Sequence, residues 1–339
     1  MKVVGILRGG PSPRQSGLRP REGGTDDNYY SSIKEGGKII AHIFENLKGH
    51  FRPLDMLVDR DGVWHISGRP ISPSELSNKV DVVWNTIHPS FSEIMRGMGI
   101  PSIEAPAFGS TLKKSREMLW EHMKQVGVKM PRTILLPVYQ EDFDLPPPRL
   151  RQGAANPKKQ YAKNKAREVY EKFSPPWIVK SFTPENSMAI HLAKTLPELE
   201  RAIEDGVNHG DSPDVKPGSS ILINQNRDIL VEEFIDGKAG ALHSVSDFRN
   251  EDVYVFPPGG FSEEEKEKLI ELAENLHRHI GAPHYLKTDF ILHPRGVIYV
   301  TDISFAPDLE EGSHFSSACE FVGARPHHIV QHILERALN

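Results

Sequence analysis

The first hundred residues alternate between short apolar runs and amphipathic stretches. Lys2–Leu7 is a short apolar run followed by a glycine turn, and Val80–Thr86 is a second, largely apolar run that ends at Ile87-His88-Pro89. Between them, Tyr30–Leu47 carries apolar side chains at helical spacing. Strands buried on both faces are rich in apolar residues, and these two runs are mostly apolar. The pattern therefore predicts an α/β fold that begins with a doubly wound parallel sheet.

Further along the chain, short strands and longer helices follow one another. We expect helices at Ser110–Val126 and Lys163–Phe173, and a surface loop or insertion at Val138–Ala162, which contains three consecutive prolines. Ser262–Glu265 has the sequence of a capping box, which predicts the start of an amphipathic helix that ends near Ile280. The expected strands of the middle region are Arg132–Pro137, Trp177–Lys180, Met188–Leu192, Ile221–Asn224 and Ile229–Phe234.

The stretch Tyr285–Leu309 predicts a β-hairpin that carries two acids. Its expected strands, Lys287–Leu292 and Val297–Ser304, are rich in β-branched and aromatic residues, and proline and glycine lie between them. Asp289 and Asp302 interrupt these apolar strands. A charged acid in an apolar strand costs free energy unless a cation or a hydrogen-bond donor meets it.

The register of the hairpin decides whether the two acids can cooperate. With a four-residue loop, His293–Gly296, Asp289 would face Val300 and Asp302 would be its diagonal neighbour on the same face. Ser304 would share that face. An odd loop would separate the acids unless a bulge intervened, so we expect an even loop. Two carboxylates and a hydroxyl would suit Mg²⁺ that also holds phosphates, whereas the alternative is an exposed face with scattered acids.

Composition narrows the functional classes. The chain has 339 residues and a net charge of -5, with no basic run long enough to indicate nucleic-acid binding. No apolar run approaches the ~20 residues that span a bilayer, and the first residues lack the features of a signal peptide. Cys319 is the only cysteine, so no internal disulfide can form. These features predict a cytoplasmic protein without a membrane or nucleic-acid partner.

Taken together, five stretches in this order resemble the D-alanine–D-alanine ligase family of ATP-grasp enzymes over nearly the whole chain. They are VVGILRGGPS, FGSTLKKSREMLWEHMKQVGVKMPR, WIVK, ILVEEFIDGK and YLKTDFILHPRGVIYVTDISFAPDL. The resemblance implies an ATP-grasp fold with three parts. These are a Rossmann-like domain over 1–105, a nucleotide-binding subdomain over 106–236 and a catalytic and metal-binding subdomain over 237–339.

The resemblance also implies roles for individual residues. Lys180 would bind ATP phosphate, and Arg116 replaces a second nucleotide-binding lysine of the family. Lys287 takes the position of an arginine that stabilises the transition state, and Ser313 lies near the serine that receives the substrate carboxylate. The residues implied to frame adenine are Glu232, Glu233, Phe234 and Ile235. Those implied to hold Mg²⁺ or Mn²⁺ are Asp289, Asp302 and Ser304.

The implied reaction is ATP-dependent joining of a carboxylate to an amine through an acyl phosphate. Its substrates would be ATP and D-alanine or a similar amino acid, its role cell-wall precursor synthesis, and the resemblance suggests a homodimer. Two alternatives stay open. The phosphate-covering loop, Ser181–Ser187, contains no glycine, which favours a non-catalytic or weakly nucleotide-binding relative. Changes on the substrate side would instead allow a ligase with a different amino-acid substrate.

Overall fold

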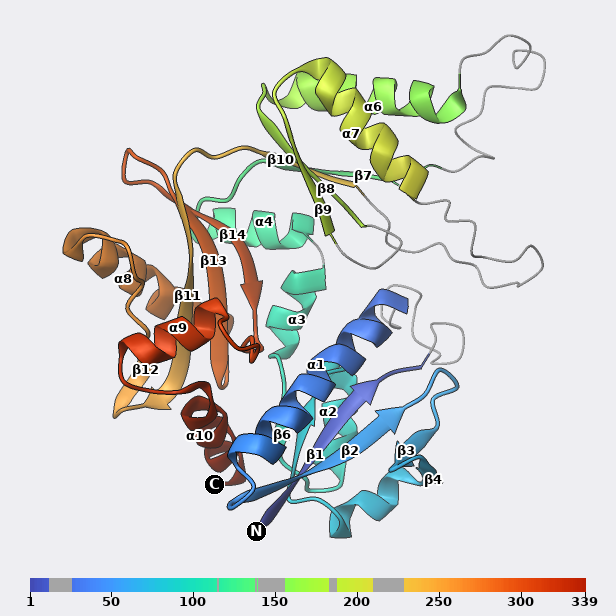
Figure 1. The fold of residues 1–339 in the computed structure, drawn as a ribbon, viewed down its shortest axis with the longest axis vertical. Coiled ribbons are helices and arrows are strands. Elements are labelled where there is room, and N and C mark those ends of the chain that lie inside the picture. Colours follow the sequence, from blue (N-terminus) through green and yellow to red (C-terminus); the bar gives the residue numbers. More distant parts are fainter. Residues whose placement is uncertain (12–25, 115, 138, 140–155, 183–187, 210–228) are drawn as a thin grey trace. The chain divides into compact units, whose positions relative to one another are not determined.

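The protein is described by a computed structural model that covers residues 1–11, 26–114, 116–137, 139, 156–182, 188–209 and 229–339 (Figure 1). The chain forms two compact units. The split unit comprises Met1–Val128 and Gly237–Asn339, and the inserted unit comprises Lys129–Asp236. The finer division at residues 105 and 236 stays a prediction.

The split unit begins with the predicted parallel sheet, which has the strand order β4-β3-β2-β1-β5-β6. β1, β2, β5 and β6 are parallel, and the short β3 and β4 are antiparallel additions. Val4 and Ile6 pack into one core, and Leu7 packs into another on the opposite face. The strands are β1 (Lys2–Gly9), β2 (Phe51–Val58), β3 (Trp64–Ile66), β4 (Arg69–Ile71), β5 (Val82–Asn85) and β6 (Ser102–Ile103). The helical segments of this part are α1 (Asp26–Asn46), η1 (Pro73–Asn78), α2 (Pro89–Gly97), α3 (Ala107–Lys114) and α4 (Arg116–Gln125).

A second, antiparallel sheet belongs to the same unit, with the order β12-β11-β13-β14. One of its faces packs against α8, where Leu269 and Ala273 meet Phe290 and Leu292. The opposite face shares a core with α9, α10 and the first sheet. The elements are β11 (Lys238–Phe248), β12 (Glu251–Val255), α8 (Glu263–Ile280), β13 (Tyr285–Leu292), β14 (Ile298–Ser304), α9 (His314–Phe321) and α10 (Pro326–Leu338).

The predicted capping box begins α8. The Ser262 hydroxyl accepts a hydrogen bond from the Glu265 N–H at 3.3 Å, and the Glu265 carboxylate accepts one from the Ser262 N–H at 2.8 Å. Gly281 ends the helix with a φ of 67°, a left-handed conformation that favours glycine. No helix in the described ranges is both long and apolar enough to cross a membrane.

The inserted unit is a four-stranded antiparallel sheet with the order β7-β10-β8-β9. Two helices, α6 and α7, cover one of its faces (Figure 1). Trp177, Val179 and Val231 are fully buried beneath them. The elements are β7 (Thr133–Leu136), α6 (Pro157–Lys172), β8 (Trp177–Phe182), β9 (Met188–Ala193), α7 (Leu196–His209) and β10 (Ile229–Glu233).

Two sequence expectations differ from this structure, and a third is not tested by it. Residues 157–162 belong to α6 rather than to a loop, because Asn156 caps the helix by accepting from the Lys158 N–H and Tyr161 is buried. The single helix expected at Ser110–Val126 is divided into α3 and α4. The strand expected at Ile221–Asn224 lies outside the described residues.

A buried histidine makes the stability of this fold pH-dependent. His277 of α8 lies 2.8 Å from the hydroxyls of both Ser244 and Ser246, and burial lowers its pKa to about 4. In the unfolded chain the His277 imidazole takes up a proton near pH 6.5. Between pH 6.5 and pH 4 the unfolded chain therefore binds more protons than the folded protein. The free energy of unfolding should therefore fall as the pH drops from 6.5 to 4, by at most roughly 1.4 kcal/mol per pH unit.

Urea unfolding at pH 7 and pH 5.5 measures this effect. We expect His277→Gln to lose most of the fall in the free energy of unfolding that His277 causes between pH 7 and pH 5.5. His50→Gln, at an exposed position, should show the same fall as the unmodified protein. An unchanged dependence in His277→Gln would show that this imidazole titrates normally in the folded protein.

Candidate active site

The hairpin of β13 and β14 places Asp289 directly opposite Asp302. The predicted four-residue loop is wrong. Leu292 pairs with Ile298 rather than Val297, and the N–H of His293 donates to the Val297 carbonyl at 2.9 Å in the same register, so the loop has an odd number of residues. This odd loop alone would have placed the acids on opposite faces.

A β-bulge restores the alignment that the loop would have lost. Phe290 pairs with Val300, but Asp289 pairs with Asp302, so Thr301 is the extra residue. Directly opposed residues of an antiparallel pair share a face. The acids are therefore closer in the ladder than the predicted diagonal arrangement.

Lys287 and Ser304 lie on the same face as the two acids. They are opposite each other, two residues from Asp289 and Asp302, and side chains alternate along a strand. Thr288 and Ile303, which lie between, are buried on the other face. The structure thus brings four of the predicted residues together at one partly exposed patch, which we call the acid patch: Lys287, Asp289, Asp302 and Ser304.

The donor chemistry of the acid patch fits a hard divalent cation. Two carboxylates and a hydroxyl offer oxygen ligands, and Mg²⁺ is commonly held by one or two carboxylates with water and substrate phosphates completing the shell. Within the described part of the chain, no group of three or more histidine, cysteine, aspartate and glutamate side chains could hold a metal by itself. Asp289 and Asp302 would therefore hold Mg²⁺ together with oxygens from a bound phosphate.

Lys287 already neutralises one of these acids. Its ammonium donates to Oδ2 of Asp289 at 2.9 Å, and both side chains are about one-third exposed or less, at 27% and 32%. A carboxylate has a second oxygen that can accept another partner. Asp289 can thus hold Lys287 and a cation at the same time, which would fix the ammonium beside the metal.

Two histidines extend this face and were not predicted. His243 of β11 pairs directly with Lys287, and its Nε2 lies 2.9 Å from Nδ1 of His314, the first residue of α9. Its Nδ1 lies 2.6 Å from the hydroxyl of Tyr285. The polar pair His243 and Ser244 between the apolar residues Leu242 and Val245 was the available signal in the sequence.

Ser313 has a structural role in the described contacts. Its hydroxyl accepts from the Ser316 N–H at 3.2 Å, which caps α9, and donates to the Asp308 carbonyl at 2.9 Å. A hydroxyl has one proton to donate. Ser313 would have to release Asp308 before it could donate to a substrate, and its predicted role stays a prediction.

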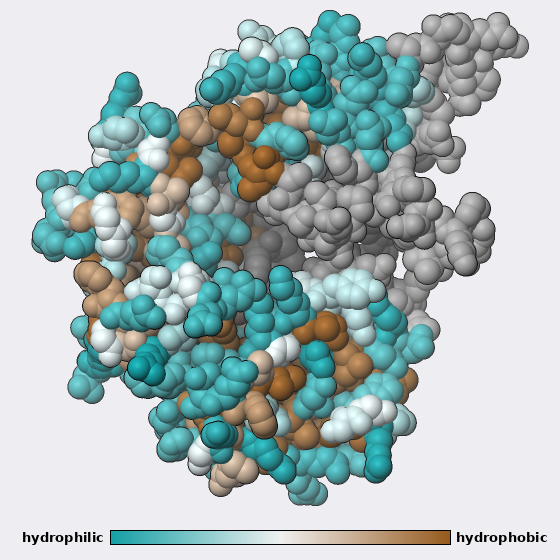
Figure 2. Space-filling view, in the orientation of Figure 1, coloured by the Kyte–Doolittle hydropathy of each residue, from teal (hydrophilic) through white to brown (hydrophobic). Residues whose placement is uncertain are grey.

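In the inserted unit, Lys180 and Glu232 meet on the sheet face that the helices leave open. Lys180 pairs with Leu230, so it is a diagonal neighbour of Glu232, and the ammonium lies 2.5 Å from the carboxylate. Leu135 and Ile190 belong to the same row of paired residues as Lys180. These apolar side chains are 39% and 61% exposed, respectively, and apolar side chains gather on this unit in Figure 2.

This open face combines exposed apolar side chains with a nearly buried carboxylate. Leu192 joins the exposed apolar side chains at 45%, whereas Glu232 is only 4% exposed. Small-molecule sites are largely apolar with a few placed polar groups. Lys180 and Glu232 supply those groups here.

The other three residues predicted to frame adenine have different surroundings from Glu232. Glu233 points to the other face of the sheet, where Arg132 binds its carboxylate at 2.8 and 2.9 Å and lowers its pKa. The Phe234 N–H donates to the Pro176 carbonyl at 3.1 Å, and its side chain is exposed. Ile235 is buried beside it. Of the two glutamates predicted to frame adenine, Glu232 directs its side chain to the open face with Lys180, and Glu233 does not.

Some predicted groups cannot be placed. Arg116 begins α4, but its side chain lies outside the described part of the structure. The same holds for residues 183–187 of the phosphate-covering loop and for most of the predicted insertion.

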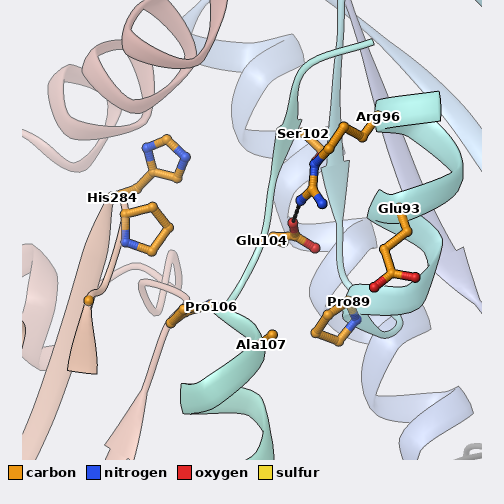
Figure 3. A pocket seen from close by; sticks show the side chains of 10 residues that line it. Pro89, Glu93, Arg96, Ser102, Glu104, Pro106, Ala107 and His284 are labelled. Atoms are coloured by element: carbon orange, nitrogen blue, oxygen red, sulfur yellow. Dashed lines mark ion pairs between the residues drawn. The ribbon is translucent and has the colours of Figure 1, made fainter. Parts of the chain in front are cut away.

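The cavity shown in Figure 3 is separate from the acid patch. It has a volume of about 320 Å³ and lies within the split unit. Glu104 lies 3.7 Å from Arg96 on one wall, and burial raises the Glu104 pKa. His284 lines the opposite side (Figure 3). None of the predicted site residues lines this cavity.

Comparison with known proteins supports a family assignment. Residues 141–335 match the family described as D-ala D-ala ligase C-terminus. The D-alanine–D-alanine ligase of Francisella philomiragia is 25% identical over 170 residues, which are 49% of this chain and 57% of that protein. The match thus spans little more than half the length of this curated relative.

Solved structures resemble the whole chain. D-alanyl-alanine synthetase A of Vibrio cholerae has a TM-score of 0.64 at 14% identity and covers 99% of this chain and 98% of its own. The D-alanine–D-alanine ligase of Bacillus anthracis complexed with ATP has a TM-score of 0.60 at 14% identity and covers 100% and 97%. At this identity the likeness shows the fold, and it confirms the predicted α/β ATP-grasp architecture. Because the family match spans more than half of the chain, the protein belongs to the D-alanine–D-alanine ligase family as a divergent member.

Proposed function

We propose that this protein is an ATP- and Mg²⁺-dependent ligase that joins a carboxylate to an amine through an acyl phosphate. The observation that carries the proposal is the direct opposition of Asp289 and Asp302, with Lys287 on the same face. Its substrates are two D-alanines or a related pair of amino acids, and its product serves peptidoglycan precursor synthesis. The similarity to the Francisella ligase and the Vibrio synthetase, and the ATP complex of the Bacillus ligase, support these assignments.

The residues of the acid patch have distinct roles in this proposal. Asp289, Asp302 and Ser304 would hold Mg²⁺, which neutralises phosphate charge when bound. Asp289 also holds the Lys287 ammonium in place through their 2.9 Å contact. Lys287 then supplies positive charge where negative charge develops on the transferred phosphoryl group. Positioning and electrostatics are the main contributions of a protein to this class of reaction.

The inserted unit contributes the nucleotide contacts. Its open face offers an apolar surface for adenine and the Glu232 carboxylate as an acceptor for the amino group. Lys180 binds phosphate as a point charge, which requires it to turn away from Glu232. Glu233, Phe234 and Ile235 stay assigned to adenine, with backbone groups doing part of the work, and Arg116 stays assigned to the nucleotide.

A second candidate function is non-catalytic nucleotide binding. The contact between Lys180 and Glu232 favours it, because a lysine that is neutralised by a buried acid attracts phosphate weakly. In that case ATP would bind without turnover.

Release of ADP and phosphate, measured with purified protein, Mg²⁺ and ATP, tests the proposal. D-alanine, other D-amino acids and L-amino acids are added separately. Release that requires D-alanine supports the proposed function, and release with a different amino acid assigns another substrate. ATP binding without release under any of these conditions would refute the ligase and support the second candidate.

A further inference from the structure

Three side chains of the split unit form a continuous hydrogen-bonded chain that ends at the acid patch. The Tyr285 hydroxyl lies 2.6 Å from Nδ1 of His243, and Nε2 of His243 lies 2.9 Å from Nδ1 of His314. Tyr285 and His243 are buried, at 2% and 1% exposure, whereas His314 is exposed. We call this the Tyr285–His243–His314 relay.

Burial determines which groups of the relay carry a proton. Burial, with smaller effects of His314 and Lys287, lowers the pKa of His243 to about 3, so this imidazole is neutral and carries one N–H. Burial raises the pKa of Tyr285 well above 10, so the phenol keeps its proton. Among the described residues, His243 is the one hydrogen-bond partner of that hydroxyl.

Only one arrangement satisfies every buried group. The Tyr285 O–H donates to Nδ1 of His243, so the His243 proton lies on Nε2 and is donated to Nδ1 of His314. The opposite direction would leave the buried phenol O–H without an acceptor, which disfavours it by about tenfold or more. Because Nδ1 of His314 accepts, its own proton lies on Nε2, and the exposed end of the relay is an N–H donor.

The charged groups around His314 would favour the binding of an anion. Burial and the Lys287 ammonium lower the pKa of His314, whereas Asp289 raises it, and His243 contacts it directly. His314 is therefore a neutral donor next to a positive charge. Ser313, its neighbour, has its only proton committed to the Asp308 carbonyl, so it does not compete as a donor.

We propose that His314 Nε2–H, fixed by His243 and Tyr285, binds a substrate oxyanion beside Lys287. The oxyanion is a carboxylate or a phosphoryl oxygen, and this identity rests on the proposed ligase function. His243 and Tyr285 are positioning residues, because they act through His314. His314→Leu would remove this donor.

The tautomer of His314 can be observed directly. In protein labelled with ¹⁵N-histidine, long-range ¹H–¹⁵N spectra distinguish a proton on Nδ1 from one on Nε2, and His314→Gln assigns the signals. We expect Nε2–H for both His243 and His314. Tyr285→Phe should allow the reversed direction and give a mixture at His314, whereas Tyr254→Phe, on β12, should leave the tautomers unchanged. A proton on Nδ1 of His314 in the unmodified protein would overturn the proposal.

Binding experiments separate the two anion sources. Inorganic phosphate and D-alanine are titrated separately in the presence of Mg²⁺ and ADP, and the Nε2 signal of His314 is followed. We expect a response to at least one of them, and His314→Leu should weaken that binding by about tenfold. His314→Gln keeps an N–H donor and should bind within about threefold of the unmodified protein, as should the exposed control His50→Gln.

Outcomes for the relay and for the ligase differ. An Nε2–H tautomer with an anion response supports the relay even if no amino acid is ligated, a result that would refute only the proposed function. Equal binding of both anions by His314→Leu and the unmodified protein would overturn the relay's role, whether or not ligation occurs.

Discussion

Asp302→Asn is expected to weaken Mg²⁺-dependent ATP binding by about 100-fold, which corresponds to about 3 kcal/mol. The substitution keeps the size of the side chain and removes one of two opposed negative charges. An amide oxygen is a much weaker ligand for a hard cation than a carboxylate. Isothermal titration of nucleotide with and without Mg²⁺ measures the loss, which should appear only when Mg²⁺ is present.

A matched control separates this effect from a general change of charge. Asp252 lies on β12 of the same sheet and pairs with Arg278 at its surface. Asp252→Asn should bind Mg²⁺ and ATP as the unmodified protein does. Equal binding by Asp302→Asn would mean that Asp302 is not a metal ligand.

Lys287→Met should reduce the rate of ADP release by about 10²- to 10³-fold, the usual loss when one electrostatic contact to a transition state is removed. Nucleotide affinity should change much less, since the charge is needed most where phosphoryl charge develops. Lys287→Arg retains the charge and should recover part of the rate. Steady-state kinetics with the substrate identified by the turnover assay measures both variants.

Removing Lys287 also leaves Asp289 without its 2.9 Å partner, so folding must be checked by urea unfolding. Lys266→Met, on α8, is a suitable control, because that lysine forms an ion pair with Glu263 on the helix surface. A normal rate in folded Lys287→Met would exclude the proposed electrostatic role.

The hairpin shows how far a sequence can predict a site. Two acids in apolar strands indicated that Asp289 and Asp302 share a face, and the structure places them there. The path to this result was different from the prediction. The hydrogen bond from His293 to Val297 closes an odd loop, and the bulge at Thr301 compensates. Alternation of apolar residues does not reveal a bulge, because one extra residue in a strand of seven leaves most of the pattern intact.

Side-chain contacts between elements that are far apart in the chain could not be predicted from the sequence pattern. Lys180 and Glu232 were each predicted to contact the nucleotide, but their ion pair depends on the register between β8 and β10. The relay joins β11, β13 and α9, which are far apart in the chain. The sequence does contain His243 and His314, but their meeting is decided by tertiary packing.

The parallel sheet and the capped α8 were easier to predict because their signals are local. Continuous apolar runs such as Lys2–Leu7 indicate burial on both faces, and Ser262 with Glu265 indicates a helix start. α6 begins earlier than predicted. The prediction placed its start too late because the first turn of the helix is polar and lacks the apolar spacing of the later turns. Asn156 and Pro157 were the signals for that start.

The central claim is that Asp289 and Asp302 hold one divalent ion. A crystal structure with Mn²⁺ and ADP tests it most directly, because the anomalous signal of manganese locates the ion independently of the protein. We predict one Mn²⁺ in contact with the carboxylates of both Asp289 and Asp302. Manganese bound elsewhere, or by only one of these two acids, would contradict the account.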